Sequence, residues 1–406
     1  MAASRIGLWL IGARGGVAST AIVGLSALAR GLAGEVGLVS CLPEFHQLPL
    51  ANWSDFVVGG HEIRQVRLVD EAAKLVSQSH AIAPELVAAC REDLEAIDAR
   101  LRPGTILGTG PAIQRLASPE IPTHETPRQA IARLQDDLRQ FAAEHRLAHT
   151  IVVNVASTEP PVQASCLPET WDALHAGLDG PLGNALPAST LYAIAALDLG
   201  CSYINFTPSL GSAPAAIDDL ARRRHTRHMG CDGKTGETLL KSTLAPMFRN
   251  RNLRVMSWVG HNIFGNLDGV VLSDPANKQA KIASKDHLLR EILGYAPQTL
   301  VSIEYIESLG DWKTAWDHVH FQGFLGTPMT LQFIWQGCDS LLAAPLVLDL
   351  VRFTEWAWRR GETGRMTFLA SFFKSPYGVS EQDFGRQFQM LQAWAATPAP
   401  PRPTPG

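Results

Sequence analysis

A group of glycines near the start of the chain has the residue types and spacing of a phosphate-binding turn. Gly12, Gly15 and Gly16 follow a short apolar run and precede a stretch rich in Ala, Ile and Leu. Glycines let backbone N–H groups approach a pyrophosphate, and the start of a helix favours an anion. Arg14 takes the place of the middle glycine of the usual fingerprint. The pattern predicts a dinucleotide site; a tight turn between a strand and a helix is the alternative.

Lysines are the second chemical signal. The chain has 35 basic residues, of which eight are lysines; Lys74 stands alone, and the other seven lie between positions 234 and 374. Because arginine carries most of the positive charge, the remaining lysines can mark places that need a compact ammonium group. Lys281 and Lys285, four residues apart, would share one face of a helix. An anion facing both of them, or an ordinary solvated face, would each explain that pair.

Several of these lysines have neighbours that suit chemistry on an anion. The glycine-rich segment 230–241 carries Asp232, Lys234 and Lys241, and its glycines let the backbone come close to a ligand. The segment 260–269 is too rich in glycine and amide side chains to be simple core. Both segments are therefore candidates for a ligand site.

Two further lysines lie among bulky apolar residues. Lys313 follows Asp311 and Trp312, and Lys374 follows Phe373. Partial burial favours proton transfer by an ammonium group near neutral pH. These two lysines are therefore candidates for acid–base chemistry.

Polar clusters end two apolar strands expected in the middle of the chain. Hydroxyl and amide groups at such positions can bind ribose or phosphate, and they can equally cap the helix that follows. The two clusters are Asn154, Ser157, Thr158 and Glu159 after the first strand, and Asn205, Thr207 and Ser209 after the second.

The elements that must hold these groups alternate between strands and helices. Such alternation predicts an α/β protein with a doubly wound, Rossmann-like parallel sheet that binds ligands at the carboxyl ends of its strands. Strands are expected at 6–11, 36–40, 56–60, 150–155 and 203–206, and helices at 17–32, 83–100, 126–144 and 190–199.

The pattern changes beyond about residue 240. A helix at 239–250 is followed by strand-like runs at 254–259, 300–305 and 330–335, which favour a largely antiparallel sheet. A mostly apolar helix at 340–359 then returns to the first unit. We therefore expect a Rossmann-like domain formed by residues 1–240 plus 337–406, with an inserted α+β catalytic and oligomerisation domain at 241–336. The proline-rich end after residue 397 is expected to be disordered.

Composition excludes some classes of function. The formal net charge of −4, without long runs of either sign, gives no basic face for nucleic acid. Six scattered cysteines without a CxxC pair suit a reducing compartment. The chain shows no signal peptide and no apolar stretch long enough for a membrane helix, so a cytoplasmic location is expected.

In combination, these motifs resemble the myo-inositol-1-phosphate synthase family. The segment 155–159 (VASTE) is similar to the family's TANTER segment, and 310–313 (GDWK) is similar to its GDSK segment. The order is the same throughout, and the resemblance covers nearly the whole chain. The further matching segments are 12–16, 59–63, 189–195, 205–208, 230–242, 261–269, 280–285, 339–346 and 373–376.

The resemblance implies an NAD-dependent isomerase, an intramolecular lyase that converts glucose 6-phosphate to 1D-myo-inositol 3-phosphate. Oxidation at C5 makes the C6 protons acidic, the enolised carbon attacks the C1 aldehyde, and the same cofactor reduces the ketone again. Ammonium groups would stabilise the negative charge that develops on oxygen. The family also implies a homotetramer, a small sugar phosphate as ligand, and no metal.

Residue matching assigns implied roles in three groups. The implied catalytic residues are Lys234, Lys241, Lys281, Lys374, Asp311 and Asp232. The implied NAD ligands are Gly12, Arg14, Gly15, Gly16, Val17, Glu62, Asn154, Ser157, Thr158 and Asp311. The implied substrate ligands are Asn205, Thr207, Ser209, Asn262, Asn266, Asp268, Lys285 and Lys313.

Glu62 takes the place of the family's aspartate as the ribose ligand. Glu44, which follows the strand expected at 36–40, is the position that a general dinucleotide-binding pattern would select.

Other departures from the family leave the substrate open. Leu239 stands where a lysine is often found, and Phe206 replaces a glycine near the expected phosphate site. A related cyclase acting on another hexose or ketose phosphate is one alternative. A simple NAD-dependent oxidoreductase and a non-catalytic NAD-sensing protein are two others.

Overall fold

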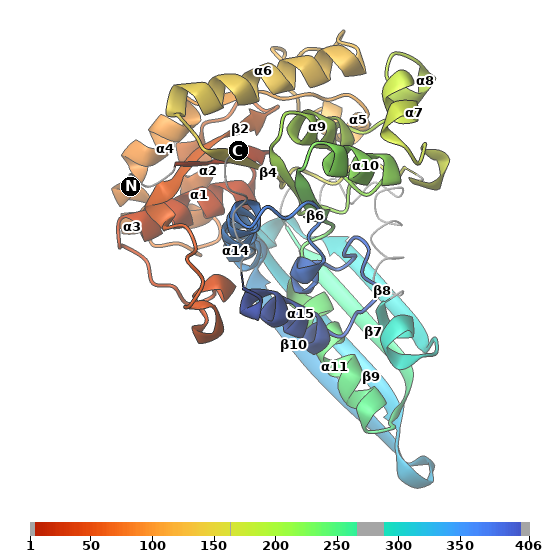
Figure 1. Ribbon diagram of the computed structural model, residues 1–406. Helices are drawn as coiled ribbons and strands as arrows, with labels where there is room; N and C mark the ends of the chain where they lie inside the picture. The colour runs from red at the N-terminus through yellow and green to blue at the C-terminus, as the bar shows by residue number, and fades with distance from the viewer. Residues whose placement is uncertain (1–4, 163, 266–287, 399–406) are drawn as a thin grey trace.

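A parallel sheet forms the centre of the protein. The computed structural model describes residues 5–162, 164–265 and 288–398 (Figure 1). Seven strands pair in the order β11-β6-β5-β4-β1-β2-β3, all of them parallel. Between β1 and β4 the order reverses, which is the switch point where such sheets bind ligands. The strands are β1 Ile6–Ile11, β2 Phe56–Glu62, β3 Leu101–Pro103, β4 His149–Asn154, β5 Ser202–Asn205, β6 Arg227–Gly230 and β11 Gly364–Arg365.

Helices pack on both faces of this sheet, which confirms the expected Rossmann-like architecture. One face carries α1 (Gly16–Ala29), α2 (Leu68–Ser77), α3 (Pro84–Ala89), α4 (Arg91–Asp98), α14 (Asp339–Arg359) and α15 (Phe384–Ala396). The other carries α6 (Pro127–His145), α7 (Trp171–Ala176), α8 (Pro181–Asn184), α9 (Ala188–Asp198) and α10 (Ala215–Arg223). The short α5 (Pro111–Gln114) follows β3.

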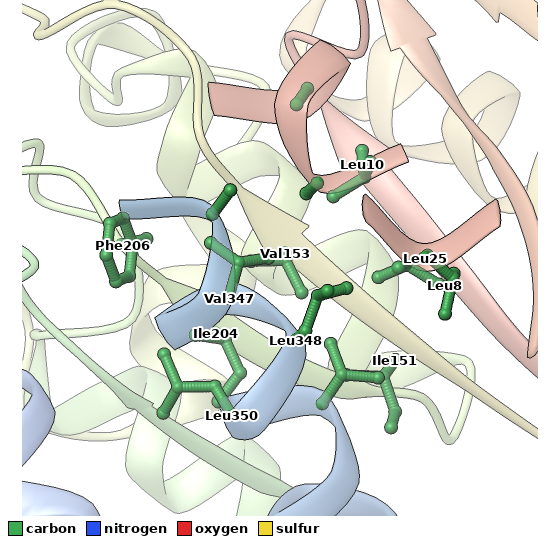
Figure 2. Packing of buried hydrophobic residues seen from close by; sticks show 14 of the residues in the cluster. Leu8, Leu10, Leu25, Ile151, Val153, Ile204, Phe206, Val347, Leu348 and Leu350 are labelled. Carbon is green, nitrogen blue, oxygen red and sulfur yellow. The ribbon is translucent and has the colours of Figure 1, made fainter. Parts of the chain in front are cut away.

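The helix α14 joins the C-terminal part of the chain to the centre of the sheet. Figure 2 shows Ile151, Val153 and Ile204 from the strands against Val347 and Leu348 of α14. All five side chains are buried. Burying an aliphatic side chain of this size contributes about 1.5–3 kcal/mol, so this contact fixes the start of α14 at the carboxyl ends of the strands.

A second sheet of four strands extends away from the first (Figure 1). Its order is β10-β9-β7-β8; β9 is antiparallel to both of its neighbours, and β7 and β8 are parallel. The helix α11 (Gly236–Asn250) packs on one face, where Phe248 contacts Trp258. The strands are β7 Arg254–Phe264, β8 Gln298–Tyr305, β9 Trp312–Gln322 and β10 Pro328–Cys338.

Three sequence expectations differ from the structure. The strand expected at 36–40 is wrong, because the N–H groups of Val39 and Ser40 donate to Asp349 of α14 rather than to a neighbouring strand. The helix expected at 83–100 is divided into α3 and α4 at Cys90. The strand β9 was not predicted, because Asp317 and its neighbouring histidines interrupt the apolar alternation of that segment.

Short 3-10 helices complete the described chain. They are η1 Val39–Cys41, η2 Pro43–Phe45, η3 Trp53–Asp55, η4 Ala164–Cys166, η5 Glu307–Leu309, η6 Phe324–Gly326 and η7 Thr367–Phe372. Among the described residues, no helix has both the length and the apolar character that a membrane span requires. The end expected to be disordered lies mostly outside the described residues.

Candidate active site

A cavity of about 240 Å³ lies at the carboxyl ends of the parallel strands, on both sides of the switch point. The loops after β1, β2, β4, β5 and β6 form its wall together with the start of α14. A second cavity of about 640 Å³ shares Glu62, Ile63 and Arg64 with the first and extends over the end of β3. By the topology of doubly wound sheets, the adenosine half of a dinucleotide belongs on the β2–β3 side and the nicotinamide half on the β4–β5 side.

The predicted glycine turn lies in this cavity and fits a pyrophosphate. Gly12 has a φ of +80°, and a Cβ there would lie 2.8 Å from the Cα of Ala156. A Cβ on Gly16 would lie 2.5 Å from the Oγ of Ser340. Side chains at either position would fill the space above the N-terminus of α1, where backbone N–H groups favour an anion. The neighbouring Val17, Ser157 and Thr158 also line the cavity.

Glu62 ends β2, the second strand of the sheet, and is buried in the cavity wall. Its carboxylate accepts hydrogen bonds from the N–H groups of Arg14 at 2.8 Å and Ile63 at 2.8 Å. It also accepts from the Arg64 guanidinium at 3.3 Å. This is the position at which Rossmann-like sheets place the acidic ribose ligand. Glu44 lies exposed in η2, because the strand expected before it does not form.

The side chain of Arg14 lies on the adenosine side. Its guanidinium donates to Asp98 at 2.7 Å and to the carbonyl of Arg64 at 3.3 Å, and it lines the second cavity. Arg14 therefore positions the loop around Glu62 and does not line the first cavity.

Two lysine–aspartate pairs lie on the nicotinamide side. The ammonium of Lys374 is 2.8 Å from Asp232, and that of Lys313 is 3.6 Å from Asp339. Lys313 also lies 5.1 Å from the ring centroid of Phe264. All four charged groups line the cavity, and they are mostly buried. Fixed cations in such a place can stabilise negative charge on a ligand oxygen.

Asp311 lies between the glycine turn and these pairs. Its carboxylate accepts from the N–H of Ser340 at 2.8 Å and from the Ser340 hydroxyl at 3.0 Å. The Cys338 thiol donates to it at 2.9 Å. Burial raises the pKa of Asp311, against the lowering effect of these hydrogen bonds. Asp311 is thus placed to meet either ligand, as the sequence suggested.

Lys234 and Lys241 do not line the cavity, and the catalytic role that the resemblance implies for them stays a prediction. Lys234 donates a hydrogen bond to Gln387 of α15. Burial lowers its pKa to about 7. Lys241 forms an ion pair with Glu237 at 2.6 Å inside the second sheet. Local sequence shows that both lysines belong to one glycine-rich segment, but not which way their side chains point.

The polar clusters after β4 and β5 are partly structural. Asn154 donates to the carbonyl oxygen of the Asn205 side chain at 3.2 Å, and the Thr207 hydroxyl donates to the same oxygen at 2.8 Å. Asn205 in turn donates to the carbonyl of Ser209. Asn154 and Thr207 line the cavity, whereas Asn205 and Ser209 hold the loop behind it.

One predicted substrate ligand lies away from the cavity, and four further predicted residues are not described. Asn262 donates to Glu237 at 2.7 Å in the second sheet and does not line the cavity. The predictions for Lys281, Lys285, Asn266 and Asp268 fall outside the described residues.

Sequence reasoning missed several residues of the cavity wall. Glu159 and Ser189 lie together there, and Tyr192 accepts a hydrogen bond from the N–H of Thr105 at 3.1 Å. Glu159 belongs to the polar cluster that the sequence indicates after this strand, but no role in the site was expected for it. Nothing in the local sequence indicates that Ser189 of α9 meets it.

The sequence and the fold both match known proteins. A sequence model of myo-inositol-1-phosphate synthase matches residues 6–395. Inositol-3-phosphate synthase 1 of Bacteroides thetaiotaomicron is 31% identical and aligns over 96% of this chain and 95% of its own length. The rat protein of the same name is 30% identical over 77% of this chain, which spans 56% of the rat protein.

Two solved structures share the fold. The inositol-3-phosphate synthase of Caenorhabditis elegans superposes with a TM-score of 0.84 at 24% identity, covering 97% of this chain and 85% of its own. A myo-inositol-1-phosphate synthase-related protein of Thermotoga maritima gives 0.77 at 23% identity, covering 96% and 98%. With the family model matching nearly the whole sequence, this chain belongs to the myo-inositol-1-phosphate synthase family.

Proposed function

We propose that this chain catalyses the NAD-dependent cyclisation of glucose 6-phosphate to 1D-myo-inositol 3-phosphate. One observation carries the proposal: a single cavity joins a dinucleotide-binding glycine turn to two lysine–aspartate pairs. The relative named inositol-3-phosphate synthase that aligns over 96% of this chain supports the same activity.

The glycine turn and Glu62 would hold NAD, with the N-terminus of α1 facing the pyrophosphate. The chemistry that the bound dinucleotide supplies is the reversible removal of hydride from the sugar. The walls after β4 and β5, with Asn154, Thr207 and Phe206, would surround the reacting carbons and exclude water.

The chain's own contribution to the chemistry is a pair of fixed cations. The enolate and the oxygen formed by aldol closure both carry negative charge, which preorganised donors stabilise in a water-poor site. Asp232 holds the Lys374 ammonium at 2.8 Å, so that cation needs little reorganisation during reaction. Lys313, at 3.6 Å from Asp339, is held more loosely and can follow a phosphate or a sugar oxygen.

Of the two main departures from the family, one lies at the site. Phe206 lines the cavity beside Asp232 and packs on Phe373, with 6.5 Å between ring centroids. Leu239 on α11 does not line the cavity. Phe206 narrows the substrate end, which makes a related cyclase for another hexose or ketose phosphate the second candidate.

Product analysis tests the proposal directly. Purified protein incubated with glucose 6-phosphate and NAD⁺ should give an inositol phosphate in the NMR spectrum, without net accumulation of NADH. Stoichiometric NADH would instead identify a simple oxidoreductase. Cyclisation of a different hexose phosphate would change the substrate assignment and leave the proposed reaction type in place.

A homotetramer is also part of the proposal. On the second sheet, Trp316 and His261 stack at 5.6 Å, and Ile334 of the edge strand β10 is 70% exposed. Long edge strands with exposed apolar residues are usually covered in the functional assembly. Light scattering at micromolar concentration should give the mass of four chains, and a monomeric mass would contradict this assembly.

A cytoplasmic location completes the proposal. None of the six cysteines forms a disulfide, which agrees with a reducing compartment. Cell fractionation that recovers the protein with the membranes or outside the cell would contradict it.

A further inference from the structure

A carboxyl–hydroxyl pair in the cavity wall has no part in the mechanism above. Glu159 follows β4, and Ser189 is the second residue of α9; both line the cavity. The Ser189 hydroxyl donates to one carboxylate oxygen of Glu159, and the Ser189 N–H donates to the other at 2.9 Å. Two segments 30 residues apart are thus joined at the nicotinamide side of the cavity.

The surroundings of Glu159 carry little charge. Its side chain is buried, and no Lys, Arg or His of the described residues forms an ion pair with it. The Glu159 N–H donates to the Ser209 hydroxyl at 3.0 Å. A neighbouring titratable side chain is Tyr203 of β5, whose pKa is raised by burial and by the Glu159 charge. The Tyr203 hydroxyl donates to the Ser189 carbonyl at 2.9 Å. Burial raises the pKa of Glu159 to about 7, against the lowering effect of hydrogen bonds from Ser189 and Ser209.

Three other carboxylates of the wall lie beside cations, those of Glu62, Asp232 and Asp339. Asp232 and Asp339 each face a lysine ammonium. Glu159 differs from these three because it has hydrogen-bond donors but no cation at ion-pair distance among the described residues, and its protonation can therefore change near neutral pH.

The Ser189 hydroxyl has room for one more partner. It donates its proton to Glu159 and accepts one hydrogen bond, from the N–H of Gly211 at 3.1 Å. A hydroxyl oxygen has two acceptor lone pairs, so among the described residues one lone pair is left for a ligand in the cavity.

We propose that Ser189 and Glu159 form a proton-accepting relay for a hydroxyl group of the sugar substrate. The substrate O–H bond breaks and its proton bonds to the Ser189 oxygen, while the Ser189 proton moves to the Glu159 carboxylate. The electron pair of the O–H bond becomes the second C–O bond of the ketone, and the hydride of the same carbon would leave to the dinucleotide that the proposed function supplies. Ser189 is the residue that touches substrate, and Glu159 acts through it; the inference rests on the proposed function.

A purely structural role would have a different signature. Glu159 also caps the N-terminus of α9, since it accepts from the backbone N–H of Ser189. Removing the Ser189 hydroxyl leaves that backbone bond in place. A cap predicts that Ser189→Ala changes little, whereas a relay predicts loss of turnover.

The test combines turnover with a direct titration of the carboxyl group. Glu159→Gln and Ser189→Ala should each lower kcat by about 10²-fold or more, the usual contribution of general acid–base catalysis, with small changes in KM. The pH profile of kcat should lose its step near pH 7 in Glu159→Gln. In the apoprotein, infrared difference spectra should show a carboxyl group titrating near pH 7 in the wild type and not in Glu159→Gln.

The matched control is Asp349→Asn, which alters another buried carboxylate that accepts backbone N–H groups but lies away from the cavity. It should lower stability without moving the pH profile. A wild-type pH profile in Glu159→Gln, or titration of Glu159 below pH 5, would overturn the relay. Failure of the wild type to cyclise any hexose phosphate would overturn the proposed function instead, and the infrared titration would still decide whether Glu159 can accept a proton near pH 7.

Discussion

Two lysine ion pairs in this protein have nearly the same local geometry and quite different surroundings. Lys374 lies 2.8 Å from Asp232, and Lys241 lies 2.6 Å from Glu237; all four side chains are at most 11% exposed. The first pair borders the cavity. The second lies between α11 and the second sheet, with Trp258 5.8 Å from the ammonium. The comparison teaches that burial and pairing alone do not identify a catalytic cation; the space beside the pair does.

Because their surroundings differ, the ammonium groups of Lys374 and Lys241 have different roles. Beside a cavity, the charge of Lys374 can act on a substrate oxygen whose charge grows during reaction. In the core, Lys241 neutralises Glu237 and lies 3.9 Å from Asp317, which is fully buried. Lys241 should therefore contribute to stability and Lys374 to rate.

The largest expected effect is on stability. Lys241→Met removes the ammonium 2.6 Å from the buried Glu237 carboxylate, and removal of one partner of a buried pair costs about 3–5 kcal/mol. Chemical denaturation should show that loss in the free energy of unfolding. The folded fraction should turn over substrate at close to the wild-type rate. Full stability combined with lost turnover would show that Lys241 acts on the substrate after all.

The next largest effect is on rate. Lys374→Met should lower kcat by about 10²–10³-fold, the usual loss for one preorganised electrostatic contact at a developing oxyanion. Steady-state kinetics on the true substrate would measure it, with Lys241→Met as the matched control in which a buried lysine away from the cavity is removed. Equal kcat values for the two variants would contradict the inference that Lys374 contributes to rate and Lys241 to stability.

The sequence predicted the sheet well because its signals are local. A strand, a glycine turn and a helix in succession at residues 6–29 suffice to place Gly12 at a ligand site. The directions of lysine side chains could not be predicted in this way because they depend on tertiary packing. Lys234 follows the cavity residue Asp232 by two positions, yet it points to Gln387, 153 positions further along the chain.

Contacts between segments that are far apart in the sequence could not be predicted from local patterns either. Ser189 reaches Glu159 only because α9 begins where β4 ends at the switch point. Likewise, the expected strand at 36–40 had suitable apolar residues, but Asp349 on α14 takes up its N–H groups. Family resemblance supplied residue identities, and the fold supplied the directions in which they point.

Lys234 extends the comparison to a buried lysine without a carboxylate at ion-pair distance among the described residues. Burial lowers its pKa from 10.5 to about 7, so the unfolded chain binds more protons between these values. The free energy of unfolding should therefore rise with pH in that window, by about 1.4 kcal/mol per pH unit, or roughly 2–3 kcal/mol from pH 8 to 10. Denaturation at several pH values should show this rise in the wild type relative to Lys234→Met. Parallel curves would contradict it.

The smallest expected effect concerns two carboxylates that both accept backbone N–H groups, Glu62 in the cavity wall and Asp349 away from it. Glu62→Ala removes the acidic group at the end of β2, and loss of a charge-assisted hydrogen bond to ribose should weaken NAD binding by about 1–3 kcal/mol. Calorimetric titration with NAD⁺ would measure the change. Asp349→Asn should leave NAD affinity unaltered while lowering stability, because its partners are Val39 and Ser40 rather than a ligand. If both variants bound NAD as the wild type does, Glu62 would serve only to hold Arg14 and Ile63 in place.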